Sequence, residues 1–196
     1  MDIIYSTSVW DLTSAKEIAA FQPQLIKIPS ACNNNYNMLT WLCENYIGEL
    51  HISLGMTTIK EEEEIINLFE KKNRNKDLII YACTSGYPVP FNDLCLLEIS
   101  RLVNKYGSIV KEIGFSGHHN GIAADIAAYT LGATTIERHY TLNRTWKGTD
   151  HAASLEPDGI RKLKRNLVAT YESLTLKESE ILPIEQVQRD KLKYRE

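Results

Sequence analysis

The chain contains few cysteines, and their spacing carries no metal or redox pattern. Its four cysteines show no C-x-x-C spacing and lie in otherwise apolar segments, at Cys32, Cys43, Cys83 and Cys95. Paired cysteines stabilise small secreted domains, and close Cys pairs are typical of zinc sites and thiol oxidoreductases. We therefore predict reduced thiols in the core of a cytoplasmic protein.

The chain also lacks long apolar runs and an excess of one charge. No run approaches the roughly 20 residues that span a bilayer, and Met1-Asp2 lacks the basic region that opens a signal peptide. The net charge is −3 and no basic stripe stands out, so we expect neither a nucleic-acid nor a membrane partner. An anionic substrate would have to be met locally, by individual Lys, Arg, metal or backbone N–H groups.

Short apolar runs alternate with helical patterns along the whole chain. Candidate strands begin near Ile3, Leu25, Leu50, Leu78, Glu112 and Thr134, at intervals of 22 to 34 residues. This rhythm is typical of repeated βα units around a parallel sheet. Six units suit an open doubly wound sheet or part of an eight-unit barrel, and periodicity does not choose between them. No low-complexity linker divides the chain, so we predict one domain over residues 1–175 and a polar tail over 176–196.

The predicted helices have recognisable ends. Thr58 and Glu61 form a capping box. An alanine-rich helix lies between Gly121 and Gly132, with the second glycine at its C-terminal end. Pro157 suits the first turn of the last long helix. The apolar stripe of that helix consists of Ile160, Leu163, Leu167, Tyr171 and Leu174.

Two predicted strands open into loops at a histidine. The segments Gly114-Phe115-Ser116-Gly117-His118-His119 and Ile136-Glu137-Arg138-His139-Tyr140-Thr141 each end an apolar run. In a barrel of parallel strands, these ends form the face where active sites lie. The segment 145–151 adds a cation, a carboxylate and another imidazole. Two imidazoles and a nearby acid suit a divalent metal such as Mn²⁺ or Zn²⁺, and spacing leaves His118 and His119 as competing ligands beside His139.

Other polar residues recur just after the strand cores, at Lys27, Ser30, Ser53, Thr84 to Tyr87, Ser116 and Glu137. Strands of a parallel sheet are largely apolar, so polar side chains at strand ends indicate a common rim. Lys27 is either a solvent-exposed strand end or a lysine inside a barrel, where it needs an anion beside it. The residues alone leave both interpretations open. His51 lies in mid-strand among apolar neighbours, and we predict that it belongs to the core.

Seven short motifs occur in the same order as in a known family. They are Lys27-Ile28-Pro29-Ser30, Asn34-Asn35-Tyr36, Ser53-Leu54-Gly55-Met56, Cys83-Thr84-Ser85-Gly86-Tyr87-Pro88, Gly114-Phe115-Ser116-Gly117-His118, Glu137-Arg138-His139 and Gly148-Thr149-Asp150. The series resembles that of the sialic acid (N-acetylneuraminate) synthases and covers almost the whole chain. The resemblance implies a TIM barrel that condenses phosphoenolpyruvate with an N-acylated hexosamine, such as N-acetylmannosamine, and releases phosphate.

The resemblance also implies roles for individual residues. His118 and His139 match two ligands of Mn²⁺ or Mg²⁺, and Glu137 matches a carboxylate beside the metal that would accept a proton or position water. Ser85 stands at a substrate-binding position where many members have Asn. The residues that match positions around the phosphate and carboxylate of phosphoenolpyruvate are Lys27, Ser30, Ser53 and Ser116. The residues that match positions facing the sugar are Tyr87 and Asp150.

The chain departs from the family pattern at both ends. Members begin with two further strands, which carry a Glu-containing motif and a Lys-x-Gln-like segment, and many end with an antifreeze-like domain. We therefore expect about six units of an eight-unit barrel: a truncated product, or part of a homo-oligomer or of a barrel that another polypeptide completes. Two other interpretations are a non-catalytic remnant and a pyruvate-dependent lyase, for which Lys27 is the candidate Schiff-base lysine.

Overall fold

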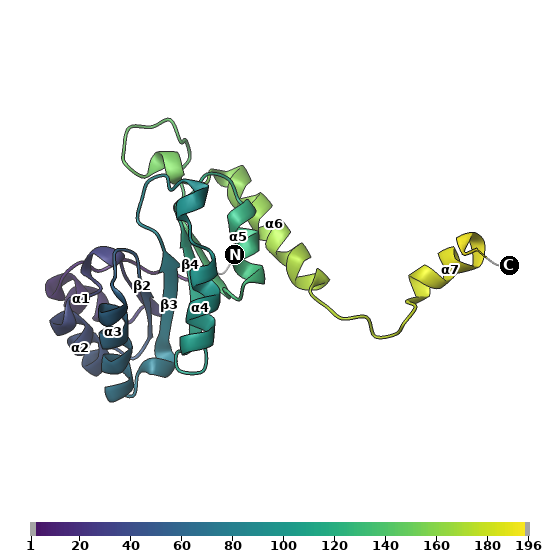
Figure 1. Ribbon diagram of the computed structural model, residues 1–196. Helices are drawn as coiled ribbons and strands as arrows, with labels where there is room; N and C mark the ends of the chain where they lie inside the picture. Colours follow the sequence, from purple (N-terminus) through teal and green to yellow (C-terminus); the bar gives the residue numbers. More distant parts are fainter. Residues whose placement is uncertain (1–2, 195–196) are drawn as a thin grey trace.

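The computed structural model describes residues 3–194. At its centre lies a sheet of five parallel strands that pair in chain order (Figure 1). The strands are β1 (Leu25–Ile28), β2 (Glu49–Ser53), β3 (Leu78–Cys83), β4 (Glu112–Gly117) and β5 (Thr135–Arg138). Each lies within one residue of a start expected from the sequence. The prediction of an α/β fold with part of a TIM-type barrel is confirmed, because the five strands form a curled half-barrel.

The sequence predicts a further strand at residues 3–8, and this prediction is wrong. The segment forms one isolated parallel bridge between Ser8 and Lys27. Two backbone hydrogen bonds hold it there, from Lys27 N to Thr7 O at 3.1 Å and from Val9 N to Lys27 O at 2.9 Å. Ile3 is 78% exposed. No strand of the described residues lies on the outer side of this segment, so its apolar side chains have no second layer to pack against.

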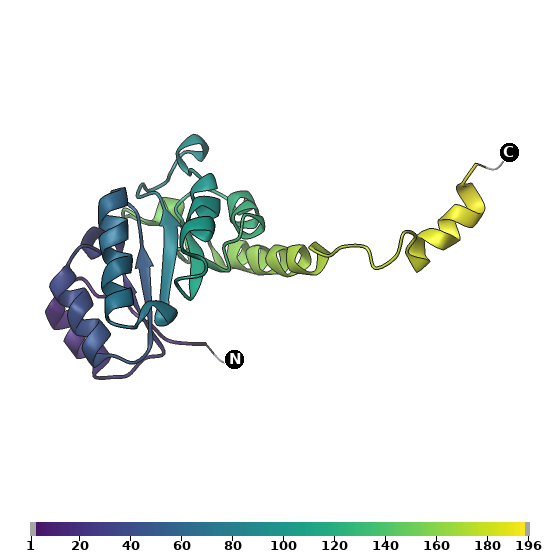
Figure 2. The same cartoon turned by 60° about the horizontal axis from the view of Figure 1, so that its bottom comes forward.

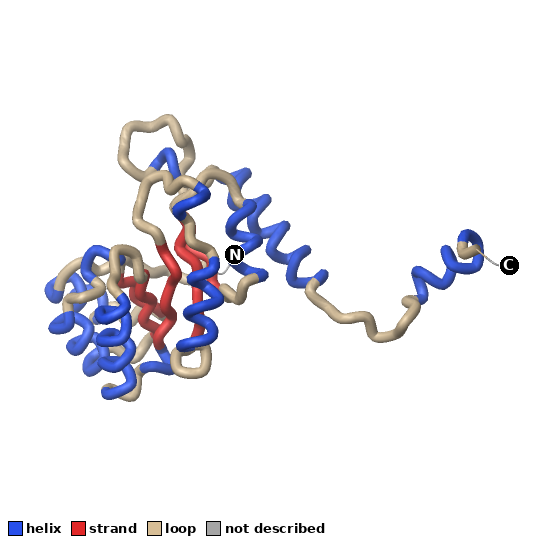
Figure 3. The backbone as a smooth tube through the Cα atoms, viewed as in Figure 1, coloured by secondary structure: helices blue, strands red, loops and turns tan. Residues whose placement is uncertain are grey.

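Helices cover the outer face of the sheet (Figure 3). They are α1 (Leu12–Ala19), α2 (Tyr36–Asn45), α3 (Ile59–Lys71), α4 (Leu97–Tyr106), α5 (Ala123–Thr130) and α6 (Pro157–Ser173), while α7 (Pro183–Leu192) lies apart from the sheet. Alternate strand residues, such as Ile26, Ile52 and Phe115, are buried beneath them. The residues between these point to the inner face of the curl. This face is polar, and strand register sets Lys27 opposite His51 and Ser116 opposite Glu137.

The helix ends follow the sequence signals. Thr58 and Glu61 form the expected capping box at the start of α3. Gly132 follows α5 with a φ of +111°, a left-handed conformation that glycine adopts without a steric cost. Pro157 is in the first turn of α6. The α6 stripe is less buried than an amphipathic pattern suggests, since Leu163 is buried while Tyr171 is 69% exposed.

The tail beyond α6 runs away from the body and ends in α7 (Figure 2). The Glu185 carboxylate accepts a hydrogen bond from the Leu182 N–H at 2.9 Å and so caps this helix. Lys177 forms an ion pair with Glu185 at 2.7 Å. Across residues 3–194, the helices are too short or too polar to cross a bilayer.

The cysteine prediction is partly wrong. All four thiols are free, and Cys32 and Cys43 are buried as expected. Burial raises the pKa of each of these two thiols to about 11. Cys95, in contrast, is exposed. It lies in the turn before α4 with a φ of +49°, so its apolar sequence context belongs to a surface turn.

Candidate active site

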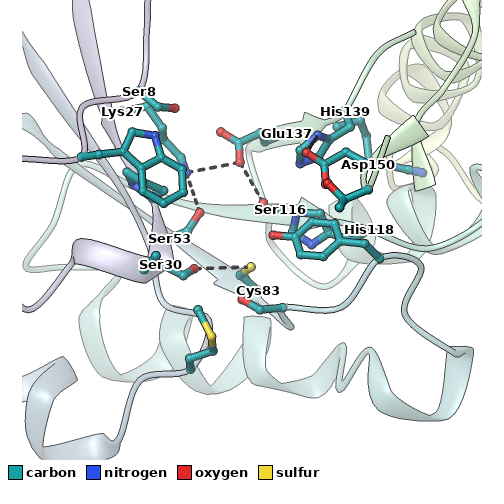
Figure 4. Close-up of a pocket in the computed structure, with 18 residues that line it drawn as sticks. Ser8, Lys27, Ser30, Ser53, Cys83, Ser116, His118, Glu137, His139 and Asp150 are labelled. Atoms are coloured by element: carbon teal, nitrogen blue, oxygen red, sulfur yellow. Dashed lines mark hydrogen bonds and ion pairs between the residues drawn. The ribbon is translucent and has the colours of Figure 1, made fainter. Parts of the chain in front are cut away.

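One cavity of about 620 Å³ opens at the carboxyl ends of the strands (Figure 4). Its walls come from strand ends and from the loops that follow them. All of the predicted site residues line it: Lys27, Ser30, Ser53, Ser85, Tyr87, Ser116, His118, Glu137, His139 and Asp150. The structure thus brings together side chains that are as far apart in sequence as Lys27 and Asp150, at the face where barrel enzymes bind their substrates.

Lys27 crosses the cavity from one outer strand of the sheet to the other. Its Nζ donates a hydrogen bond to Ser53 Oγ at 2.7 Å and lies 3.3 Å from Glu137 Oε1. Glu137 Oε1 also accepts a hydrogen bond from Ser116 Oγ at 2.8 Å. Because β1 and β5 are the two edges of the sheet, this contact requires a strong curl. The Lys27 side chain is 12% exposed, so the structure favours the interior lysine with an anion beside it, and that anion is Glu137.

Hydroxyl groups gather around Gly55 on the neighbouring wall. The Gly55 N–H donates a hydrogen bond to Ser30 Oγ at 3.0 Å, and Ser30 Oγ lies 3.8 Å from Cys83 Sγ. A Cβ on residue 55 would meet Ser85 Oγ at 2.4 Å and Ser30 Oγ at 2.7 Å. Glycine is therefore required for this close approach. The Cys83 thiol, predicted to be a core group, instead lines the cavity.

Two imidazoles and a phenol form the opposite wall. The ring centroids of His118 and His139 are 5.1 Å apart. The Tyr87 ring lies edge-on to both, 4.6 Å from His118 and 5.8 Å from His139. Burial raises the pKa of the Tyr87 hydroxyl, so this group is a neutral donor at pH 7.

One imidazole is hydrogen-bonded to a group outside the pair, and the other has a carboxylate nearby. His118 Nδ1 lies 3.1 Å from the Thr84 carbonyl oxygen, so Nδ1 carries the hydrogen and Nε2 is the nitrogen with a free lone pair. His139 Nδ1 lies 3.7 Å from Asp150 Oδ2. Metal-binding histidines are oriented in this way by carbonyl and carboxylate groups. Burial, with the nearby His139, lowers the pKa of His118, which favours the neutral form that a metal binds.

These residues fit a divalent cation held by two imidazoles rather than a closed structural site. Within the described chain, no group of three or more His, Cys, Asp or Glu side chains is arranged to hold a metal ion. Asp150 faces His139 Nδ1, and Glu137 faces Lys27 and Ser116, so neither carboxylate completes a ligand set. A cation held by these two imidazoles alone would take its remaining coordination positions from water and substrate.

The structure separates the two adjacent histidines that spacing left open. His118 lines the cavity. His119 is fully buried on the far side of the loop, where its Nε2 lies 3.2 Å from Arg138 Nη1 and 3.4 Å from Asp125 Oδ2. His118 is therefore the histidine of this pair that faces the cavity.

Sequence reasoning missed several residues of the site. Arg138 and Asp125 form a buried ion pair at 2.5 Å. The sequence marks this pair only by a single acidic residue in the apolar run Ala123-Ala124-Asp125-Ile126-Ala127. Trp10 and Met56 line the cavity although they are 60% and 71% exposed. No periodic pattern marks such residues, because they lie in loops.

A curled sheet of parallel strands with a polar cavity at its carboxyl ends is the architecture of part of an α/β barrel. The family comparison agrees with this class and narrows it. The chain belongs to the NeuB family, whose model matches residues 1–179.

Three relatives show how the chain relates to known members. It is 32% identical to the human N-acetylneuraminate-9-phosphate synthase over 97% of this chain and 52% of that protein. It is 31% identical to the N,N'-diacetyllegionaminic acid synthase of Campylobacter jejuni over 83% of this chain and 48% of that protein. The structure of the N-acetylneuraminic acid synthetase of Leptospira borgpetersenii, in complex with citrate, superposes with a TM-score of 0.81 at 28% identity, covering 96% of this chain and 65% of that one. The chain thus spans about half the length of these two curated relatives.

Proposed function

We propose that the chain forms most of the catalytic barrel of a nonulosonic acid synthase. The reaction joins phosphoenolpyruvate to an N-acylated hexosamine, such as N-acetylmannosamine, and releases phosphate. The observation that carries this proposal is the single cavity in which Lys27 and several hydroxyl groups face two imidazoles. The proposal also draws on the relatives, whose names are those of sialic and legionaminic acid synthases.

The Lys27 side of the cavity suits the anionic donor. Phosphoenolpyruvate carries a phosphate and a carboxylate, which charge-assisted and hydroxyl hydrogen bonds would bind. Lys27 supplies the charge, and the hydroxyl donors come from Ser30, Ser53, Ser85 and Ser116. Lys27 keeps donor capacity after its bond to Ser53, because an ammonium has three N–H groups.

His118 and His139 would hold a divalent cation, Mn²⁺ or Mg²⁺, on the other side. When bound there, the cation supplies Lewis-acid polarisation of the sugar aldehyde. Tyr87 lies beside the two imidazoles and contacts each of them edge-on. Tyr87 and Asp150 supply a hydroxyl and a carboxylate to bind the sugar hydroxyl groups.

Glu137 is placed to move protons in the second half of the reaction. After C3 of phosphoenolpyruvate bonds to the aldehyde carbon, water adds at C2 and the C2–O bond to phosphate breaks, leaving a 2-keto acid. The water loses both of its protons, of which one ends on the aldehyde oxygen and the other leaves with phosphate. Glu137 would accept the first proton from this water, with Lys27 and Ser116 fixing the orientation of its carboxylate.

The same contacts argue against a Schiff-base lyase. A Schiff-base lysine must be a neutral amine, which desolvation or a neighbouring cation favours. Lys27 Nζ instead lies 3.3 Å from a carboxylate oxygen and donates a hydrogen bond to Ser53 Oγ at 2.7 Å, so it is engaged with polar partners and not held in an apolar pocket. The position of Lys27 therefore supports an anion-binding role.

The test is phosphate release by the protein that carries this chain in a complete barrel, supplied with phosphoenolpyruvate, N-acetylmannosamine and Mn²⁺. We expect release that requires both substrates, and no covalent adduct when pyruvate and borohydride replace them. Phosphoenolpyruvate turnover that does not depend on the sugar, or a borohydride-stable adduct at Lys27, would overturn the proposal.

A further inference from the structure

Arg138 carries a buried charge between two residues of the cavity, Glu137 and His139. Its side chain is 2% exposed and that of its partner Asp125 is fully buried. The guanidinium donates to Asp125 Oδ2 at 2.5 Å, to the Gly121 carbonyl at 2.9 Å and to the His119 carbonyl at 2.6 Å. A longer contact, 3.4 Å, reaches the Ala153 carbonyl. With the contact to His119 Nε2 at 3.2 Å, one side chain thus contacts five groups, which belong to residues 119, 121, 125 and 153.

These partners belong to the loops that carry the two cavity imidazoles. His119 and Gly121 lie in the loop after β4, next to His118. Ala153 ends the loop after β5, which contains Asp150 and begins at His139. Asp125 lies in the first turn of α5 and fixes the guanidinium from the helix side. Arg138 therefore ties the backbone beside one imidazole to the loop that begins at the other.

Burying the cluster of Arg138, Asp125 and His119 is costly in free energy. Among residues 3–194, three of its buried polar atoms have no hydrogen-bond partner: His119 Nδ1, Asp125 Oδ1 and Arg138 Nε. Burying a charged pair costs several kcal/mol per ion, and apolar replacements are often as stable. An incompletely bonded ion pair beside a cavity is more consistent with fixing a geometry than with adding stability.

We propose that Arg138, held by Asp125, is a positioning residue that sets the separation of the His118 and His139 rings. This inference rests on the proposed metal role of the two imidazoles. An arginine is required because its planar group presents several donors in fixed directions, whereas a lysine ammonium is a single point with a different reach. Arg138 lines the cavity between Glu137 and His139, and in this role it acts by holding two loops in register and not by binding metal or substrate.

The direct test compares Arg138→Lys with Arg101→Lys. Arg101 donates two hydrogen bonds to Glu62, at 2.9 Å and 2.7 Å, between α4 and α3. It is a matched arginine–carboxylate pair that does not line the cavity. We expect Arg138→Lys to weaken Mn²⁺ binding, measured by electron paramagnetic resonance, by about 10- to 100-fold, the range for residues that orient metal ligands. Arg101→Lys should lower the melting temperature and leave Mn²⁺ binding unchanged. Equal Mn²⁺ affinity in both variants would overturn the inference.

A metal-free readout separates this inference from the metal proposal. Amide hydrogen exchange at residues 118–121 and 139–153 should accelerate in Arg138→Lys and stay unchanged in Arg101→Lys. If the wild-type chain binds no Mn²⁺, the metal proposal fails, and exchange alone then decides whether Arg138 holds the loops. If Arg138→Lys does not fold, Asp125→Asn replaces it, with the same expected changes. Unchanged exchange in both loops would show that Arg138 does not position them.

Discussion

On the Lys27 side of the cavity the side chains are joined to one another by hydrogen bonds and an ion pair, whereas on the imidazole side they meet through ring contacts and one longer charged contact. Lys27 is 12% exposed and is joined to Ser53 and Glu137. On the other side, the His139 and Asp150 side chains are 37% and 48% exposed and lie 3.7 Å apart. Lys27, Ser53 and Glu137 lie on strands of the hydrogen-bonded sheet, while His139 and Asp150 lie in the loop after β5.

This difference shows two ways of fixing side chains in one barrel. On strands, the pairing of Lys27 with His51 and of Ser116 with Glu137 follows from the backbone ladder. A loop has no such ladder, so its geometry depends on individual side chains that bridge it to its neighbours. Arg138 and Tyr87 do so here, as does Arg144, which donates to Asn120 Oδ1 at 2.6 Å and to the Ala152 carbonyl.

The largest effect is expected on the imidazole side. His118→Ala and His139→Ala should each reduce Mn²⁺ affinity by roughly 100-fold or more, since only two protein ligands are proposed. His51→Asn is the matched control, because His51 is buried and bonded to Tyr81 at 2.6 Å, outside the imidazole pair. Paramagnetic resonance titration measures all three. Retained binding in either alanine variant would break the assignment of that ligand.

A smaller loss is expected on the Lys27 side. Lys27→Met should weaken phosphoenolpyruvate binding by about 1.5–3 kcal/mol, the cost of a hydrogen bond to a charged group. Lys111→Met serves as the control, because Lys111 pairs with Glu49 at 2.5 Å, away from the cavity. Calorimetric titration with phosphoenolpyruvate distinguishes the two. An equal loss in both variants would mean that the effect arises from net charge and not from the cavity.

A third prediction concerns the two open edges of the sheet, at residues 3–8 and at β5. Neither residues 3–8 nor β5 pairs on its outer side with another strand of the described chain, and an open apolar edge is a template for association. The 196-residue chain alone should therefore associate with rising concentration in light scattering, and be catalytically poor. A stable monomer that turns over at about 1 s⁻¹ or faster would contradict this.

The smallest effect should be on the pH dependence of stability. Burial lowers the pKa of His51 from its ordinary value of 6.5, so the folded chain keeps this imidazole neutral where the unfolded chain protonates it. This contribution is present above about pH 6.5 and is lost as the pH falls through the folded value. Between pH 7.5 and 5.5, the urea midpoint should therefore fall less in His51→Asn than in the wild type. Parallel curves would show that His51 does not contribute.

Sequence patterns predicted the strands on the Lys27 side of the cavity well, and the loops on the imidazole side only in part. Apolar residues located β1 to β5, because the strand residues that face the covering helices are buried and apolar. Spacing did not separate His118 from His119, since the direction of a loop side chain depends on contacts such as those of Arg138. The segment 3–8 has the apolar pattern of a strand. A strand also needs neighbouring strands to pair with, and sequence periodicity does not show whether these are present.

The most direct measurement is the relaxation of the phosphorus nucleus of phosphoenolpyruvate in the presence of protein-bound Mn²⁺. The two sides of the cavity face each other, so a Mn²⁺ ion on the imidazoles lies close to a donor bound at Lys27. We expect protein-dependent broadening of the phosphorus resonance that disappears in His118→Ala, which loses the ion, and in Lys27→Met, which loses the donor. Phosphoenolpyruvate that binds without such broadening while Mn²⁺ is also bound would show that the two ligands do not share this cavity.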